Sequence, residues 1–179
     1  WLINLVENLL SVTRIEEGRL NLHITEDLVD DVITEALHHV NRKSVEHHIT
    51  VRHKEDYLLA KMDAKLMVQV VINIVDNAIK YTPKGSNILI KTWKQGDKAV
   101  ISIADDGDGI PDEMKERVFD MFYSGANKIA DSRRSLGLGL SLCRSIVNAH
   151  GGKITVSDNT PHGTVFTITL SAGEVEIHE

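Results

Sequence analysis

Two pairs of alternating apolar and polar runs constrain the fold of this chain more than any other feature. Residues 88–94 and 99–104 form one pair, and Gln95-Gly96-Asp97 between them has the chemistry of a tight hairpin turn. Residues 154–158 and 165–170 form the other pair. Successive side chains of a strand point to opposite faces, so each pair predicts a hairpin with one apolar face that another element must cover.

The sequence also predicts helices that could cover this apolar face. Two shorter alternating runs, 49–51 and 57–61, predict further strands. Apolar residues recur at helical spacing in three segments, which are residues 28–40, residues 63–81 with Asp63 as the N-cap, and residues 140–150 before Gly151-Gly152. Because helices interleave with hairpin-linked strands, the sequence predicts an α/β sandwich in which helices cover one face of a mixed, mainly antiparallel sheet.

The N-terminal residues predict a separate helix. Residues 1–17 carry a narrow apolar stripe at helical spacing, and the pattern is already under way at Trp1, so we expect a fragment of a longer protein. One such helix cannot bury its own stripe. It should pack on upstream helices or a second subunit, or else lie on the domain itself. The expected units are a helix at 1–20, a domain at 21–173 and an acidic tail at 174–179.

Composition narrows the class of protein. The chain carries 20 Lys and Arg against 26 Asp and Glu, and its net charge of −6 argues against nucleic-acid binding through bulk positive charge. No apolar run approaches the roughly 18 residues that span a bilayer, so we expect no membrane contact by this segment. The single cysteine, Cys143, excludes an internal disulfide, suits a reducing cytosol and is expected to be a buried apolar residue.

The histidines predict no metal centre. The pairs His38-His39 and His47-His48 lack zinc-site spacing, and we expect them on the surface. His150 stands at a predicted helix end beside Gly151 and is expected to act as a cap.

The helix predicted at 63–81 has a polar stripe as well as an apolar one. The polar stripe contains Gln69, Asn73, Asn77 and Lys80. Asparagine has a low helix propensity, so two asparagines one turn apart lower the stability of the helix without an evident local interaction that compensates for it. Amide oxygens can complete the shell of a Mg²⁺ ion that nucleotide phosphates hold, and a lysine can neutralise phosphate charge. For any one of these residues alone, a solvated polar face is the simpler interpretation.

A loop rich in aspartate and glycine follows the strand predicted at 99–104. Gly107 and Gly109 would let the backbone approach a flat ligand closely, and Asp105 at the strand end could accept a hydrogen bond from an exocyclic amine such as that of adenine. A calcium loop is disfavoured because the acidic spacing breaks at Ile110 and the glutamate at the twelfth position is missing. A plain acidic turn remains open for this loop in isolation.

A second glycine cluster opens the last predicted helix. Gly137 and Gly139 would leave backbone N–H groups bare beside the positive end of the helix dipole, which suits phosphate oxygens. The cluster is neither a dinucleotide fingerprint nor a P-loop. The preceding segment predicts a mobile cover over a ligand, with a disordered surface loop as the alternative. Its aromatic anchors and cations are Phe119, Phe122, Lys128, Arg133 and Arg134.

In this order the motifs resemble the N, G1, F and G2 boxes of the sensor histidine kinase ATP-binding domain, from the GHKL superfamily that includes gyrase, Hsp90 and MutL. The resemblance covers roughly residues 25–172. Residues 126–152 are similar to potassium-responsive kinases of the KdpD type. The matching stretches are Asn73-Ile-Val-Asp-Asn77-Ala-Ile-Lys80-Tyr81, Asp105-Asp-Gly107-Asp-Gly109-Ile-Pro, Phe119-Asp-Met-Phe122 and Gly137-Leu-Gly139-Leu.

The resemblance implies a Bergerat-type fold that binds ATP and Mg²⁺. It implies that Asn77 is a metal ligand with Asn73 beside it, and that these two residues and Lys80 form the catalytic set. It implies that Asp105 contacts the adenine amine. The other residues expected at the nucleotide are Tyr81, Gly107, Gly109, Ile110, Phe122, Lys128, Arg134, Gly137, Leu138, Gly139 and Leu140.

The resemblance also implies a function and partners. The superfamily's hydrolases carry a glutamate where Asn73 stands, and an amide cannot deprotonate water, so efficient hydrolysis is disfavoured. None of the histidines lies in the family's phosphoacceptor block. We therefore expect the catalytic region of a two-component sensor kinase, which transfers the γ-phosphoryl group of ATP to a histidine upstream of this segment.

The expected partners are the upstream phosphoacceptor helix, a response regulator and a second copy in a full-length homodimer. Residues 1–20 would be one helix of the dimerisation hairpin, in the cytoplasmic portion of a membrane-anchored sensor. Two alternatives stay open. One is a nucleotide-gated binding module without transfer activity, which Ser135-Leu136 makes conceivable because the G2 box usually has small residues there; the other is a GHKL-type ATPase.

Overall fold

The computed structural model describes residues 21–40, 46–120 and 138–174. The helix expected at 1–17 lies outside these ranges, and its place in a bundle stays a prediction, as do the domain limits. Some expected nucleotide-binding groups also lie outside the described part, namely Phe122, Lys128, Arg134, Gly137 and the side chain of Leu138.

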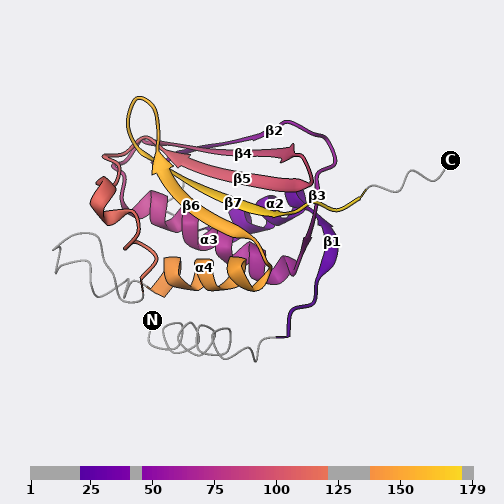
Figure 1. The fold of residues 1–179 in the computed structure, drawn as a ribbon. Helices are drawn as coiled ribbons and strands as arrows, with labels where there is room; N and C mark the ends of the chain where they lie inside the picture. The colour runs from indigo at the N-terminus through magenta and orange to yellow at the C-terminus, as the bar shows by residue number, and fades with distance from the viewer. Residues whose placement is uncertain (1–20, 41–45, 121–137, 175–179) are drawn as a thin grey trace.

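A five-stranded mixed sheet forms one layer of the fold (Figure 1). Its spatial order is β2-β4-β5-β7-β6; β2 runs parallel to β4, and the other neighbours are antiparallel. The two hairpins predicted from the alternating runs are β4–β5 and β6–β7. The strands are β2 (His48–His53), β4 (Asn87–Gln95), β5 (Lys98–Asp105), β6 (Lys153–Asp158) and β7 (Thr164–Ser171).

Three helices cover one face of this sheet, as the sequence predicts (Figure 1). They are α2 (Val29–His39), α3 (Ala64–Lys80) and α4 (Leu138–Ala149). The apolar stripe of α3 is buried between the sheet and its neighbours through Met67, Val70, Val71, Ile74, Val75 and Ala78. Within the described ranges, no helix is both long enough and apolar enough to span a bilayer.

The bounds of α3 follow from its end residues. The Asp63 carboxylate accepts a hydrogen bond from the Leu66 amide at 3.4 Å, which confirms the predicted N-cap. Asp63 Oδ2 also accepts from the His23 amide at 3.1 Å, so the same side chain fixes the segment that enters the domain. At the other end, the Tyr81 amide donates to the Asn77 carbonyl oxygen at 3.1 Å and closes the last turn.

A small second sheet combines the strand that the sequence predicts at 57–61 with one strand that the sequence does not indicate. β1 (Thr25–Leu28) pairs antiparallel with β3 (Leu59–Met62). The sequence predicted an extended link up to residue 25 and a helix from Leu28, whereas Leu28 is extended and the Val29 amide donates to the Leu58 carbonyl oxygen at 2.9 Å. This pairing keeps Leu28 out of the helix. Tyr57, expected in the second short strand, lies outside it and is 73% exposed.

Two of the histidine expectations need correction or extension. His47 was expected on the surface, but it is 9% exposed and its imidazole contacts the loop after α3. His150 does more than cap its own helix. Its Nδ1 donates to the Ile146 carbonyl oxygen at 2.7 Å, so Nε2 is left to accept the Asp63 amide at 3.0 Å. The neutral imidazole therefore joins the end of α4 to the start of α3.

Candidate functional site

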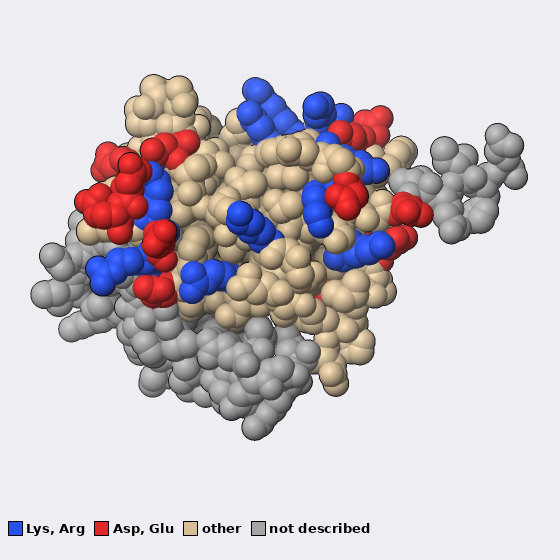
Figure 2. Space-filling model, in the orientation of Figure 1, with Lys and Arg blue, Asp and Glu red and all other residues tan. Residues whose placement is uncertain are grey.

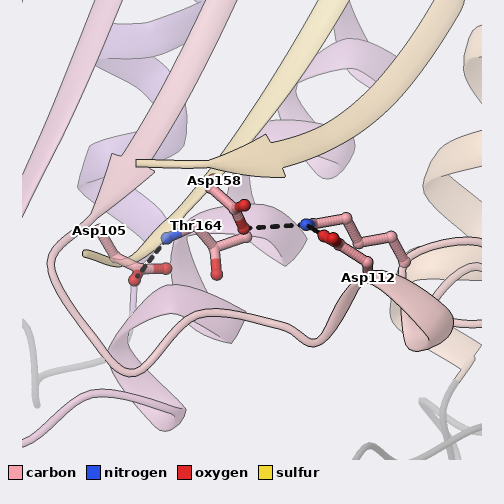
Figure 3. Close-up of polar contacts among 5 residues, drawn as sticks. Asp105, Asp112, Asp158 and Thr164 are labelled. Carbon is pink, nitrogen blue, oxygen red and sulfur yellow. Dashed lines mark hydrogen bonds and ion pairs between the residues drawn. The ribbon is translucent and has the colours of Figure 1, made fainter. Parts of the chain in front are cut away.

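Asp105 is the most constrained side chain at the end of β5. It is 9% exposed, and one carboxylate oxygen, Oδ1, accepts from the Gly107 amide at 3.0 Å. The same oxygen accepts from the Thr164 amide at 3.3 Å (Figure 3). Burial raises the pKa of Asp105 above its ordinary value, although these two hydrogen bonds act in the opposite direction. The other oxygen, Oδ2, accepts no hydrogen bond from a described residue. Asp105 is thus a fixed, buried carboxylate with one acceptor oxygen to spare.

The glycines of the loop are required by the chain's own packing. A Cβ on Gly107 would lie 2.9 Å from the Thr82 methyl carbon and 3.1 Å from Asp105 Oδ1. Gly109 has φ +79°, which favours glycine, and a Cβ there would lie 3.2 Å from the Gly163 carbonyl oxygen. The sequence predicted that these glycines allow close approach. In the described structure the close neighbours are protein atoms that hold Asp105 in place.

The loop between β6 and β7 is the part of the site that sequence reasoning missed. The Asn159 side-chain amide donates to the Asp105 carbonyl oxygen at 2.8 Å, and His162 Nδ1 donates to the Gly107 carbonyl oxygen at 3.0 Å. Gly163 has φ +117°, and a Cβ there would lie only 1.9 Å from the Asp105 carbonyl oxygen. The one signal in the sequence is Gly163 itself, a glycine directly before the strand that starts at Thr164.

Asp106 anchors the same loop from the other side. Its two carboxylate oxygens accept from the backbone amide and the side-chain amide of Asn87, each at 2.9 Å. Burial alone raises the pKa of Asp106, but the hydrogen bonds from Asn87, together with its own backbone amide and the nearby His162, lower it by more, so the net direction is down. Both carboxylate oxygens of Asp106 are therefore used at the start of β4. Of the two neighbouring aspartates, Asp105 is the one that could accept a hydrogen bond from a ligand.

Carboxylates gather at this end of the molecule. Figure 2 shows them at the left, the end at which β5 finishes in Figure 1. Lys115 is only 17% exposed among them and pairs with both Asp112 and Asp158, the latter at 2.9 Å (Figure 3). The hydrogen bonds to Asp112 and Asp158 raise the pKa of Lys115. This ammonium therefore ties the short η2 helix (Asp112–Met114) to the end of β6.

The polar stripe of α3 lies on one face, but its two asparagines differ. Asn73 Oδ1 accepts from the Gln69 side chain at 2.9 Å, and Asn73 Nδ2 is buried with no oxygen or nitrogen partner among the described residues. Burial raises the pKa of the neighbouring Cys143 thiol to about 12, although the Asn73 amide beside it lowers the value. Asn77 is half-buried, and its side chain makes no hydrogen bond to a described residue. Of the two asparagines, Asn77 is the one whose amide oxygen accepts no hydrogen bond from a described residue.

The end of α3 meets the aspartate loop. The Thr82 hydroxyl donates to the Ala78 carbonyl oxygen at 2.7 Å, and its methyl group closes over Gly107. The Lys80 ammonium lies 5.2 Å from the centre of the Tyr81 ring, a cation–π distance. The structure thus brings the end of the helix that carries the polar stripe into contact with the aspartate loop, through Thr82 and Gly107.

The third predicted element is described only in part. α4 begins at Leu138, so Gly139 lies inside its first turn rather than before it, and a Cβ on Gly139 would meet no atom within 4 Å. Leu140 and Ile110 are half-buried and pack against the core. Phe119 is 5% exposed, with the Phe166 ring edge-on at 6.0 Å and the Arg144 guanidinium 5.5 Å away. Phe119 is therefore packed in the core, while the cover that it is expected to anchor lies outside the described residues.

Known proteins share this sequence pattern. A family model described as histidine kinase-, DNA gyrase B- and HSP90-like ATPase matches residues 62–174. The sensor protein KdpD of Clostridium acetobutylicum is 42% identical over 170 residues, which cover 95% of this chain and 19% of that protein. The Escherichia coli KdpD is 33% identical over 98% of this chain and 20% of its own length. The chain thus spans about a fifth of these relatives, and the expected similarity to KdpD is confirmed.

Solved structures share the fold. The catalytic domain of the histidine kinase ThkA superposes with a TM-score of 0.74 at 30% identity, covering 83% of this chain and 95% of that domain. The mycobacterial sensor histidine kinase MprB gives a TM-score of 0.73 at 26% identity, covering 83% and 97%. The chain therefore belongs to the family of histidine kinase-, DNA gyrase B- and HSP90-like ATPases, as a histidine kinase catalytic ATP-binding domain.

Proposed function

We propose that this chain binds ATP between the polar stripe of α3 and the loop after β5, and presents the γ-phosphoryl group to a histidine upstream of this segment. The observation that carries the proposal is the state of Asp105. Its side chain belongs to a residue that is only 9% exposed, its Oδ1 is used by two backbone amides, and its Oδ2 accepts no hydrogen bond from a described residue. An acceptor oxygen that the chain itself leaves unused, on a carboxylate held in place by two backbone amides, is suited to accept a hydrogen bond from a ligand donor.

The adenine amine is the donor that fits best. An exocyclic N–H donating to Asp105 Oδ2 would make a charge-assisted hydrogen bond inside a partly dry site, where such a bond is stronger than in water. Guanine carries a carbonyl oxygen at the equivalent ring position and would place acceptor against acceptor. The same contact would therefore select adenine over guanine.

A magnesium ion would fit this site only if the nucleotide phosphates supplied most of its ligands. Among the described residues, no group of three or more His, Cys, Asp or Glu could hold a metal, and the Asn73 oxygen is already bonded to Gln69. Asn77 alone would supply one oxygen, so the phosphate oxygens would supply most of the shell. When bound, Mg²⁺ would neutralise phosphate charge during transfer. We therefore assign Asn77 to the metal and Asn73 to its support.

The chain's own groups suit transfer better than hydrolysis. The Lys80 ammonium would offset the charge of the phosphates, with Tyr81 beside it. Asn73 stands where the superfamily's hydrolases carry a general base, and an amide can neither deprotonate water nor be freed cheaply from Gln69. A GHKL-type ATPase would release phosphate steadily from ATP without an acceptor, and measured release by the isolated chain would favour that alternative.

The partners proposed for the parent protein follow from its relatives. The kinase ThkA has been solved in complex with the response regulator protein TrrA; it is 28% identical over 94% of this chain. We propose that the parent of this chain likewise transfers its phosphoryl group onward to a response regulator and works as a homodimer through residues 1–20. Phosphorylation by a longer chain that includes the upstream helix would separate a kinase from a binding module without transfer activity.

Ligand-dependent stability tests the site directly. The chain should melt at a higher temperature with ATP or ADP, and Mg²⁺ should add to the effect of ATP. Asn77→Ala should lose most of the increment due to Mg²⁺, with ATP affinity in Mg²⁺ falling about tenfold. Alanine favours helix, so this loss would not reflect unfolding of α3. Asn148→Ala, at an exposed position of α4, is the matched control.

Two outcomes would contradict these assignments. An unchanged magnesium increment in Asn77→Ala would remove Asn77 from the metal shell. If the melting temperature of the folded chain did not change in millimolar ATP or ADP, the proposed function as a whole would be contradicted.

Nucleotide binding should depend on pH through Asp105. The ionised carboxylate is the better acceptor, and its raised pKa means that protonation begins at a higher pH than for an ordinary aspartate. ADP affinity should therefore weaken as pH falls toward mildly acidic values.

The contribution of Asp105 to the stability of the ligand-free chain should change with pH in the opposite direction to ADP affinity. A raised folded-state pKa means that this group's contribution to the free energy of unfolding decreases as pH rises between its ordinary and its raised pKa. Titration calorimetry with ADP and urea unfolding of the ligand-free chain, both as functions of pH, measure the two trends. Because the lowered pKa of Asp106 acts on stability in the other direction, the contribution of Asp105 is the difference in stability between the wild type and Asp105→Asn, and a difference that does not change with pH would contradict the raised pKa of Asp105.

A further inference from the structure

We propose that His47 is a positioning residue for the nucleotide site: it holds Thr82 in the rotamer that seats Gly107 against Asp105. Its effect on the nucleotide rests on the proposed function. The contacts themselves are those of the described structure, and they run from the start of β2 through the end of α3 to the loop after β5.

The first step is the bond between His47 and Thr82. His47 Nε2 lies 2.8 Å from the Thr82 hydroxyl oxygen, and that hydroxyl lies 2.7 Å from the Ala78 carbonyl oxygen. A carbonyl oxygen only accepts, so the hydroxyl proton goes to Ala78 and the hydroxyl oxygen accepts from His47 Nε2–H. His47 Nδ1 is buried without a partner among the described residues. The contacts therefore place a proton on Nε2.

The second step is that the backbone on both sides of His47 is fixed. The Gly85 amide donates to the Glu46 carbonyl oxygen at 2.7 Å, and the His48 amide donates to the Ser86 carbonyl oxygen at 3.0 Å. These bonds join the entry of β2 to the loop after α3. The imidazole thus reaches Thr82 from a rigid support and has little freedom to leave it.

The third step is the contact between Thr82 and Gly107. The Thr82 methyl group fills the space where a side chain at Gly107 would stand, because a Cβ there would lie 2.9 Å from it. Turning the Thr82 side chain would move the methyl group away and leave Gly107 unsupported. Gly107 donates its amide to Asp105 Oδ1 at 3.0 Å, and this bond lowers the pKa of Asp105 against the effect of burial. His47 thereby acts on Asp105 through two intermediates.

Variants of His47 separate donor chemistry from simple packing. Glutamine places an amide nitrogen near the position of His Nε2, whereas asparagine reaches only as far as Nδ1. His47→Gln should therefore keep the bond to Thr82, and His47→Asn should lose it. Thr82→Val keeps a branched side chain but removes the hydroxyl, so it should match His47→Asn if the bond is what matters.

The experiment is titration calorimetry of the whole chain with ADP as a function of pH. His47→Asn and Thr82→Val should each weaken ADP binding about tenfold at neutral pH, and His47→Gln should stay within about twofold of the wild type. In His47→Asn the pH at which ADP binding is half lost should also move up, because Asp105 has lost the bond that lowers its pKa. A residue that only packs would not move this midpoint.

Nitrogen NMR of the imidazoles completes the test and keeps it separate from the proposed function. The wild-type His47 should show the Nε2–H tautomer, and Thr82→Val should shift its Nε2 signal and the Gly107 amide signal. Equal ADP affinity and equal midpoints for His47→Asn and His47→Gln would overturn the proposal. If the wild type binds no ADP, the proposed function is contradicted. The role of His47 is tested independently of ADP, because an unchanged Gly107 amide signal in folded His47→Asn would overturn it.

Discussion

Gly163→Ala should destabilise the chain more than any other single glycine substitution at the site, by about 4 kcal/mol or more. Two costs combine. A residue with a Cβ is strained at the φ of +117° that Gly163 adopts, and its Cβ would stand 1.9 Å from the Asp105 carbonyl oxygen. Neither side can retreat, because Asn159 and Thr164 bind Asp105 from the same hairpin at 2.8 and 3.3 Å. Urea unfolding measures the loss.

Gly96→Ala is the matched control for this substitution. Gly96 has a positive φ of +61°, but a Cβ there would meet no atom within 4 Å. Alanine at this hairpin turn should cost only the backbone strain, about 1 kcal/mol. The difference between the two variants therefore isolates the overlap with Asp105. Equal losses would mean that the hairpin loop does not press on the aspartate loop in solution.

Most of the fold could be predicted because its signals are local. The cap at Asp63, the apolar stripe of α3 and the turn at Gly96 each depend on residues within a few positions of one another, and each was found where it was expected. β1 was missed because its partner β3 lies far along the chain. Its four residues carry no alternation that distinguishes a strand from a helix start.

The support of the site could not be predicted for the same reason. His47 is buried where it contacts Thr82, 35 positions along the chain, and nothing in the pair His47-His48 indicates which histidine faces inward. Gly163 contacts Asp105 across 58 positions of sequence, a separation at which spacing carries no information. The site residues themselves were assigned through the family resemblance, and their roles remain proposals.

The polar stripe of α3 shows a finer limit. Helical spacing placed Gln69, Asn73 and Asn77 on one face, and this is how they lie. Spacing alone did not indicate that Gln69 would engage the oxygen of Asn73 and leave that of Asn77 available. An amide can donate or accept, so only the actual pairing decides which oxygen could meet a metal.

Asp105→Asn should abolish most nucleotide binding while leaving the fold intact. The amide oxygen of asparagine can keep both hydrogen bonds that Oδ1 now accepts, from Gly107 and Thr164. The amide nitrogen then takes the place of Oδ2 and presents a donor to the donating adenine amine. Loss of a charge-assisted bond, about 1.5–3 kcal/mol, and this mismatch should together weaken ADP binding about 100-fold or more.

The stability of the ligand-free chain should not fall with the same substitution, although ADP affinity should. This difference makes the test selective for a role in binding. Burial raises the pKa of Asp105, so the ionised carboxylate costs folding free energy at neutral pH, and asparagine should leave the ligand-free chain equally stable or slightly more stable. Asp108→Asn, at an exposed position of the same loop, should change neither quantity. Calorimetry with ADP and urea unfolding give the two readings. If Asp105→Asn lost binding only together with stability, Asp105 would be a structural group; if it kept wild-type affinity, the acceptor for adenine would have to lie elsewhere.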